Sequence, residues 1–71
     1  MDAATVARLK AWRRDESLRK GIPAFRILTD RSLLDLVHAA PRTAADLAAV
    51  SGLGRKTIEA YGSEILALIG E

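Results

Sequence analysis

Apolar residues recur at helical spacing along most of this chain. Near its start, a stripe of mostly apolar residues runs at intervals of three and four positions: Val6, Leu9, Trp12 and Glu16. The stripe predicts a helix from Asp2 to Lys20, with one face buried. Gly21 predicts the end of that helix, because glycine favours the position just past a helix C-terminus. Arg13 lies beside the stripe, so we expect its stem to pack on the core and its guanidinium to meet a carboxylate.

The next segment, Ile22 to Leu28, is apolar but contains Pro23, which disfavours helix at the residue before it. We expect a loop with a single 3₁₀ turn, whose aliphatic residues plug the core beneath it. Phe25 has two interpretations. Its spacing favours the core, where aromatic side chains are usually buried. The alternative is an outward-facing ring on which a nucleic-acid base stacks.

Three further helices follow from the pattern. Thr29 or Asp30 is expected to cap the second, whose inward side is formed by Leu33, Leu34, Leu36 and Val37. Pro41 follows that helix, and Thr43 is expected to cap a short third helix that runs from Ala44 to Val50. Asp46, three residues after Thr43, imitates a capping box.

The last predicted helix runs from Arg55 to Ile69. Its apolar face consists of Ile58, Tyr61, Ile65, Leu68 and Ile69. Gly62 interrupts it, and we expect another helix to approach closely there, since glycine otherwise weakens a helix. The predicted fold class is therefore all-α, a compact bundle of four to five short helices with a helix-hairpin-helix-like glycine turn. Residues 1–71 are expected to form a single domain.

The glycine turn, Gly52-Leu53-Gly54, is the strongest candidate for chemistry. It opens directly into the last helix, and the free amides and positive dipole at such a start suit a phosphate. Arg55 and Lys56 add positive charge there. The alternative is a plain corner, with Gly52 in a left-handed conformation and Gly54 allowing close packing. Spacing alone leaves both possibilities open.

Composition narrows the class of function. The chain of 71 residues has no cysteine and one histidine, His38, so disulfides, thiolate metal sites and a histidine metal site are not expected. The sequence contains no phosphate-binding loop or dinucleotide-binding glycine pattern and no paired nucleophile and base. It also lacks the run of ~20 apolar residues that a membrane span needs. We expect a non-catalytic module without cofactor, metal or membrane association.

The charge balance is only mildly basic, with 11 Lys and Arg against 9 Asp and Glu. A net charge of +2 does not by itself indicate nucleic-acid binding, so only the placement of the charges is informative. Lys10 and Arg14, four residues apart, share an exposed edge of the first helix. Arg26 follows Phe25 directly, and the glycine turn carries its own pair of cations.

Taken in order, the motifs resemble the HRDC (helicase and RNase D C-terminal) domain family. The resemblance covers about Ala4 to Ile69 and rests on Leu9-x-x-Trp12-Arg13, Ile22-Pro23-Ala24-Phe25, Leu28-Thr29-Asp30-x-x-Leu33, Pro41-Arg42-Thr43, Leu47-x-x-Val50-x-Gly52-Leu53-Gly54 and Tyr61-Gly62. It implies a bundle of about five short helices that acts as an auxiliary nucleic-acid-binding module. Phe25 occupies the place of an aromatic residue that contributes to single-strand binding in bacterial RecQ proteins.

The resulting hypothesis is a weak, sequence-nonspecific DNA-binding domain cut from a larger RecQ-type or UvrD-like bacterial helicase. Single-stranded or branched DNA is the expected partner, and the parent helicase core is another. The isolated domain is expected to be a monomer in the bacterial cytoplasm, associated with the nucleoid. The expected contact residues are Lys10, Arg14, Phe25, Arg26, Gly52, Leu53, Gly54, Arg55 and Lys56. Two alternatives remain: a protein-docking module with little DNA affinity, and an RNA-binding domain beside an RNase D-like nuclease.

Overall fold

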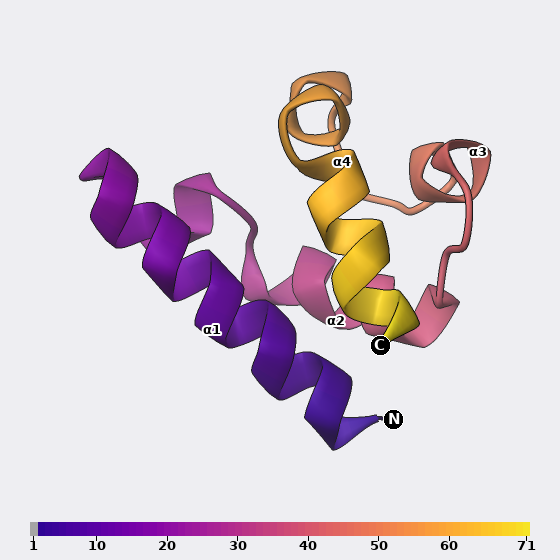
Figure 1. The fold of residues 1–71 in the computed structure, drawn as a ribbon. Coiled ribbons are helices and arrows are strands. Elements are labelled where there is room, and N and C mark those ends of the chain that lie inside the picture. Colours follow the sequence, from indigo (N-terminus) through magenta and orange to yellow (C-terminus); the bar gives the residue numbers. More distant parts are fainter. Residues whose placement is uncertain (1) are drawn as a thin grey trace.

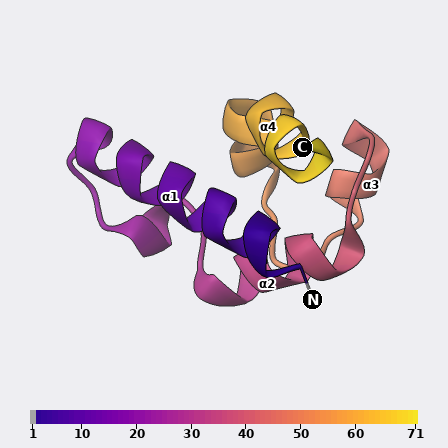
Figure 2. The ribbon, with the colours of Figure 1, turned by 60° about the horizontal axis from the view of Figure 1, so that its bottom comes forward.

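The computed structural model describes residues 2–71. Its elements are α1 (Ala3–Lys20), the 3₁₀ turn η1 (Ala24–Arg26), α2 (Asp30–Ala39), α3 (Ala44–Ala48) and α4 (Arg55–Gly70). All regular structure in this part of the chain is helical, which confirms the predicted fold class. α4 packs against α1 on one side and α3 on the other, while α1 also packs against α2 and η1 (Figure 1). The turned view places α2 opposite α4, with α1 and α3 flanking them (Figure 2).

Side-chain caps explain where the first three helices begin. Asp2 accepts hydrogen bonds from the backbone amides of Ala4 and Thr5, at 3.0 and 3.3 Å. Thr29, rather than Asp30, caps α2, because its hydroxyl accepts from the amide of Ser32 at 3.1 Å. These bonds satisfy amides that a helix start otherwise leaves without partners.

The third helix differs from its prediction in two details. It ends at Ala48 instead of Val50, although Val50 still points into the core. Thr43 caps it as expected, but the carboxylate of Asp46 accepts from the amide of Arg42 at 3.0 Å, not from Thr43 itself. The capping box is therefore displaced by one residue toward the N-terminus.

The core is mainly aliphatic, with Tyr61 as its one buried aromatic residue among those described, and draws on every α-helix. Its fully buried members are Leu9, Leu33, Leu36, Leu47 and Ile65. Ile27 and Leu28 plug it beneath the loop, as predicted. The prediction that Leu34 faces inward is wrong, because this residue is 38% exposed. In a helix, Leu34 lies about 100° around the axis from Leu33, so it falls at the edge of the face formed by Leu33, Leu36 and Val37.

Two glycines act differently from each other. Gly52 has φ +86° and a Cβ there would lie 2.9 Å from the hydroxyl oxygen of Ser32, so both backbone and space demand glycine. At Gly62, α3 does approach through Leu47, but a Cβ would meet the Leu47 Cδ1 atom at an ordinary 3.5 Å. The expected close packing at Gly54 is wrong, because a Cβ there would meet no atom of the described chain within 4 Å.

These distances predict opposite effects for two alanine substitutions. Gly52→Ala should lower the free energy of unfolding by about 1–2 kcal/mol or more, because alanine is strained at positive φ and also meets Ser32. Gly62→Ala should raise it by about 0.5–1 kcal/mol, the helical preference of alanine over glycine. Urea unfolding followed by circular dichroism measures both. A destabilised Gly62→Ala variant would contradict the contact distances at Leu47.

Candidate nucleic-acid interface

The loop between α1 and α2 presents the aromatic ring that the sequence left ambiguous. Phe25 lies in η1 and is 64% exposed, so the ring points outward and the core interpretation is wrong. The reason is local: Ile27 and Leu28, the next apolar residues, already occupy the core beneath the loop. Arg26, the next residue in the chain, is also exposed. An exposed ring next to a cation is a surface on which a base can stack.

Arg13 joins α1 to the end of this loop. Its guanidinium donates to the backbone carbonyl of Leu28 at 2.9 Å and pairs with the carboxylate of Asp30 at 2.8 Å. The Arg13 side chain is only 13% exposed, whereas that of Asp30 is 76% exposed. The expected structural role of Arg13 is therefore confirmed. Its hydrogen bond, and then its charge, lower the pKa of Asp30 below the ordinary 3.8, with a smaller contribution from the charge of Lys10.

Lys10 and Arg14 lie on the edge of α1 that faces the start of α2. Lys10 is one helical turn before Arg13, which binds Asp30 at the start of α2, and Arg14 is one turn after Lys10. Both are exposed. Within residues 2–71, the cations that form no ion pair include four of the predicted contact residues: Lys10, Arg14, Arg26 and Lys56.

The glycine turn holds its predicted conformation, but its amides are not all free. The amide of Leu53 donates to the carbonyl of Val50 at 3.4 Å, and the side chain of Leu53 packs against the core. Gly54 is the N-cap of α4 and has no side chain to satisfy the amides of the first helical turn. That turn carries Arg55 and Lys56, and Arg55 forms an exposed pair with Glu59 at 3.5 Å.

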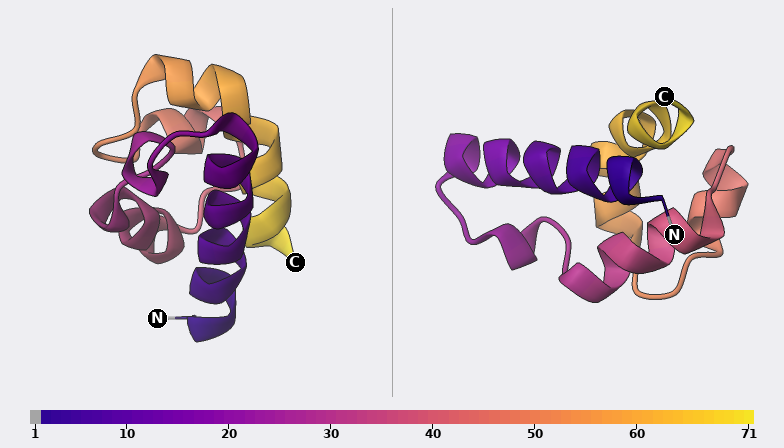
Figure 3. Two further views of the ribbon diagram at one scale, coloured as in Figure 1. Left: turned by 90° about the vertical axis from the view of Figure 1, so that its left-hand side faces the viewer. Right: turned by 90° about the horizontal axis from the view of Figure 1, so that it is seen from below.

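The aromatic loop and the glycine turn lie toward the same side of the molecule, around the first turn of α2 (Figure 3). A hydrogen bond from the hydroxyl of Ser32 to the carbonyl of Gly52, at 3.4 Å, joins α2 to the glycine turn. The structure thus brings the predicted contact residues into two groups, one on each flank of the α2 start. Arg31, which the sequence analysis missed, lies in the first turn of α2 and is exposed, with only a 4.0 Å contact to Asp35. Its position two residues after the cap Thr29 was the available signal.

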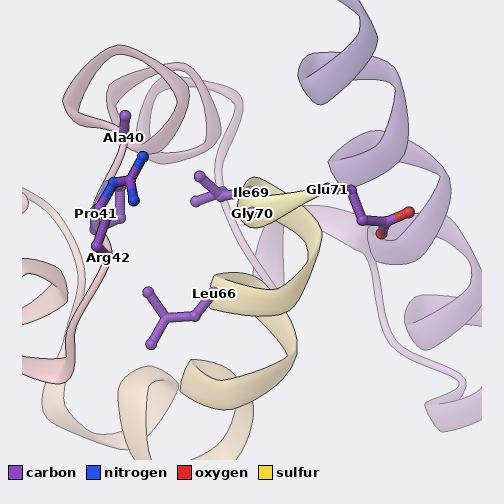
Figure 4. A pocket seen from close by; sticks show the side chains of 7 residues that line it. All are labelled: Ala40, Pro41, Arg42, Leu66, Ile69, Gly70 and Glu71. Carbon is purple, nitrogen blue, oxygen red and sulfur yellow. The ribbon is translucent and has the colours of Figure 1, made fainter.

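Of two hollows in the surface, one lies away from the predicted contact residues. One of about 420 Å³ is formed by the connection after α2 and the end of α4, with Arg42 and Glu71 as its charged residues (Figure 4). It contains no predicted contact residue. A hollow of about 350 Å³ adjoins the glycine turn and includes Leu53, Arg55 and Ile58. Among the described residues, no three acidic or histidine side chains gather as metal ligands, and no helix is long and apolar enough to cross a membrane.

One family model and several known proteins resemble this chain. The model for the HRDC domain matches residues 2–69. The ATP-dependent DNA helicase UvrD2 of Mycobacterium tuberculosis is 32% identical over 69 residues, which is 97% of this chain and 10% of the helicase. Ribonuclease D of Granulibacter bethesdensis is 40% identical over 62 residues, 86% of this chain and 16% of the nuclease. This chain therefore spans only a small part of either relative.

Among solved structures, HRDC domain 3 of D. radiodurans RecQ superimposes with a TM-score of 0.91 at 43% sequence identity. The match covers 96% of this chain and 90% of that one. The structural match and the family model therefore cover nearly the same residues of this chain.

The ion pair of Arg13 with Asp30 predicts an acid-dependent loss of stability. Because the folded-state pKa of Asp30 lies below 3.8, the pair stabilises the fold above that value and is lost as the pH falls through the folded-state pKa. Between about pH 5 and about pH 2, the free energy of unfolding should therefore fall less steeply with decreasing pH for Asp30→Asn than for the wild type. An equal pH dependence of the free energy of unfolding in the two proteins would contradict a stabilising pair of Arg13 with Asp30. Asp2, whose pKa is lowered by hydrogen bonds from Thr5, contributes equally to both.

Proposed function

This chain belongs to the HRDC domain family, and we propose that it is an auxiliary nucleic-acid-binding domain of a bacterial DNA helicase. Membership supports the broader statement that the chain is an accessory module of the kind found in helicases and RNase D. The narrower proposal is weak, sequence-nonspecific binding to single-stranded or branched DNA, which tunes the substrate choice of a larger protein in the bacterial cytoplasm. Residues 1–71 act in it as one domain.

The exposed ring of Phe25 is the observation that carries the proposal. The residue is 64% exposed, and a base is a suitable partner for its ring because each base has an aromatic face. The neighbouring free cations, Lys10, Arg14 and Arg26, suit the phosphates on either side of a stacked base. Stacking on a ring tolerates any sequence, which agrees with nonspecific binding.

The glycine turn supplies a second contact in this proposal. The uncapped first turn of α4 offers amides and a positive dipole to a phosphate, and Arg55 and Lys56 add charge. Positive charge at a helix start interacts unfavourably with the positive end of the helix dipole, so an anion bound there would relieve that interaction. A strand that touches both groups would pass over the start of α2, where Arg31 lies.

RNA binding is the second candidate, because Ribonuclease D is among the relatives and the proposed contacts are to phosphates and base faces. Such contacts distinguish RNA from DNA poorly, since they do not read the 2′-hydroxyl. Titration with DNA and RNA strands of one sequence separates the two candidates. Failure of both to bind would favour a docking module instead.

The electrostatic part of the proposal predicts a salt-dependent affinity. If about three phosphates are neutralised, log affinity should fall against log salt with a slope near −2 for a single strand. Fluorescence anisotropy with a labelled oligonucleotide between about 50 and 200 mM salt measures the slope. The double variant Arg55→Glu with Lys56→Glu should bind more weakly and with a shallower slope. A salt-independent affinity would rule out this model.

The stacking part predicts a loss that charge variants do not share. Phe25→Ala should weaken single-strand binding by about 1–3 kcal/mol, or roughly 5- to 150-fold, with little change in the salt slope. Phe25→Leu is the matched variant, because it keeps an apolar side chain at this exposed position but removes the aromatic face, so it should lose affinity to a similar extent. Wild-type affinity of Phe25→Leu, or no loss from Phe25→Ala, would remove stacking on Phe25 from the contact surface.

A further inference from the structure

We propose that Arg13 is a positioning residue for the nucleic-acid face, which holds Phe25 in place through the backbone of Leu28. The inference rests on the proposed function and adds a residue that none of the contact predictions included. It explains how a short loop at the surface of a small domain keeps its exposed ring in one place.

Burial separates Arg13 from the contact residues. Its side chain is 13% exposed and both arms of its guanidinium are occupied, one by the Leu28 carbonyl and one by the Asp30 carboxylate. It is therefore poorly placed to meet a phosphate itself. An arginine buried to this degree with two oxygen partners fixes the positions of those partners instead.

The connection from Arg13 to Phe25 is short and continuous. The carbonyl of Leu28 accepts from Arg13 at 2.9 Å, while the amide of the same residue donates to the carbonyl of Ala24 at 3.2 Å. Ala24 precedes Phe25 and also accepts from the amide of Ile27 at 3.0 Å. One guanidinium arm thus holds Leu28, the residue whose own amide is bonded back to Ala24, the first residue of the 3₁₀ turn.

The other arm fixes the opposite side of Thr29. Asp30 is the first residue of α2, so its pair with Arg13 sets the start of α2 against α1. Lys10 and Arg14 lie on the same edge of α1. The Phe25 ring therefore keeps one position relative to these two cations, and a nucleic-acid strand can bind them without first ordering the loop. A lysine could hold one of the two oxygens but lacks the planar fork that reaches both.

The test combines Arg13→Met with Phe25→Ala in a double-mutant cycle. Arg13→Met should weaken single-strand binding by ~5-fold or more, as the loss of a stacked base does. In the Phe25→Ala background, the same substitution should have little further effect, because the ring it positions is gone. Independent, multiplying losses would show that Arg13 does not act through Phe25, and unchanged binding of Arg13→Met would overturn the proposal.

Arg19→Met is the matched control. Arg19 is also a cation of α1 with an acidic partner, since it pairs with the buried carboxylate of Glu16 at 2.7 Å, but it lies about 120° around the helix axis from Arg13. It should lower thermal stability without changing DNA affinity. If Arg13→Met fails to fold, Arg13→Lys retains the stem and charge and should show the same coupling to Phe25. Wild-type affinity of Arg13→Lys would contradict the claim that the planar guanidinium must bind both oxygens.

Hydrogen exchange keeps this inference distinct from the proposed function. In Arg13→Met, the amide of Leu28 should exchange faster than in the wild type, while the amide of Leu47, bonded to Thr43 in α3, should not change. A wild-type chain that binds no nucleic acid would defeat the proposed function even if the Leu28 amide responds. A Leu28 amide that does not respond would defeat the positioning role even if the wild type binds.

Discussion

The fold depends on the burial of a few aliphatic side chains that come from all four α-helices. Leu9 of α1, Leu33 and Leu36 of α2, Leu47 of α3 and Ile65 of α4 are essentially inaccessible. A domain of 71 residues buries only about 60% of the surface that its unfolded chain exposes. No helix here has enough apolar contacts to spare, so each one must keep its inward face toward the same centre. Short loops suit this arrangement, because consecutive helices pack on the same core.

Polar contacts then fix how the helices and loops are oriented around that core. Arg8 of α1 donates to the carbonyl of Leu68 at 3.2 Å, at the end of α4. Trp12 packs edge-on against Tyr61 and donates to the carboxylate of Glu64 at 2.7 Å. Arg13 holds the other side of α1 to the loop before α2. α1 is therefore tied to both of its neighbours by long side chains, and the candidate interface lies on the side that Arg13 fixes.

The sequence predicted the helices well because their signals are local. Gly21 takes the left-handed conformation expected past a helix end, and Thr43 caps α3 as expected. Arg13 was also predicted correctly, since a cation beside a buried stripe needs an anion nearby. Spacing failed at Phe25 and Leu34, where neighbouring residues compete for a core of fixed size and only the assembled fold decides which are buried. The placement of the aromatic loop beside the glycine turn depends on the path of α2 and could not be predicted locally.

The most direct test of the account is a heteronuclear NMR titration of the wild-type chain with a short single-stranded oligonucleotide. Amide shifts should concentrate at residues 24–31 and 52–56, with Lys10 and Arg14 also affected. Shifts confined to the cavity at Ala40 to Arg42, or no shifts at saturating DNA, would contradict the proposed interface.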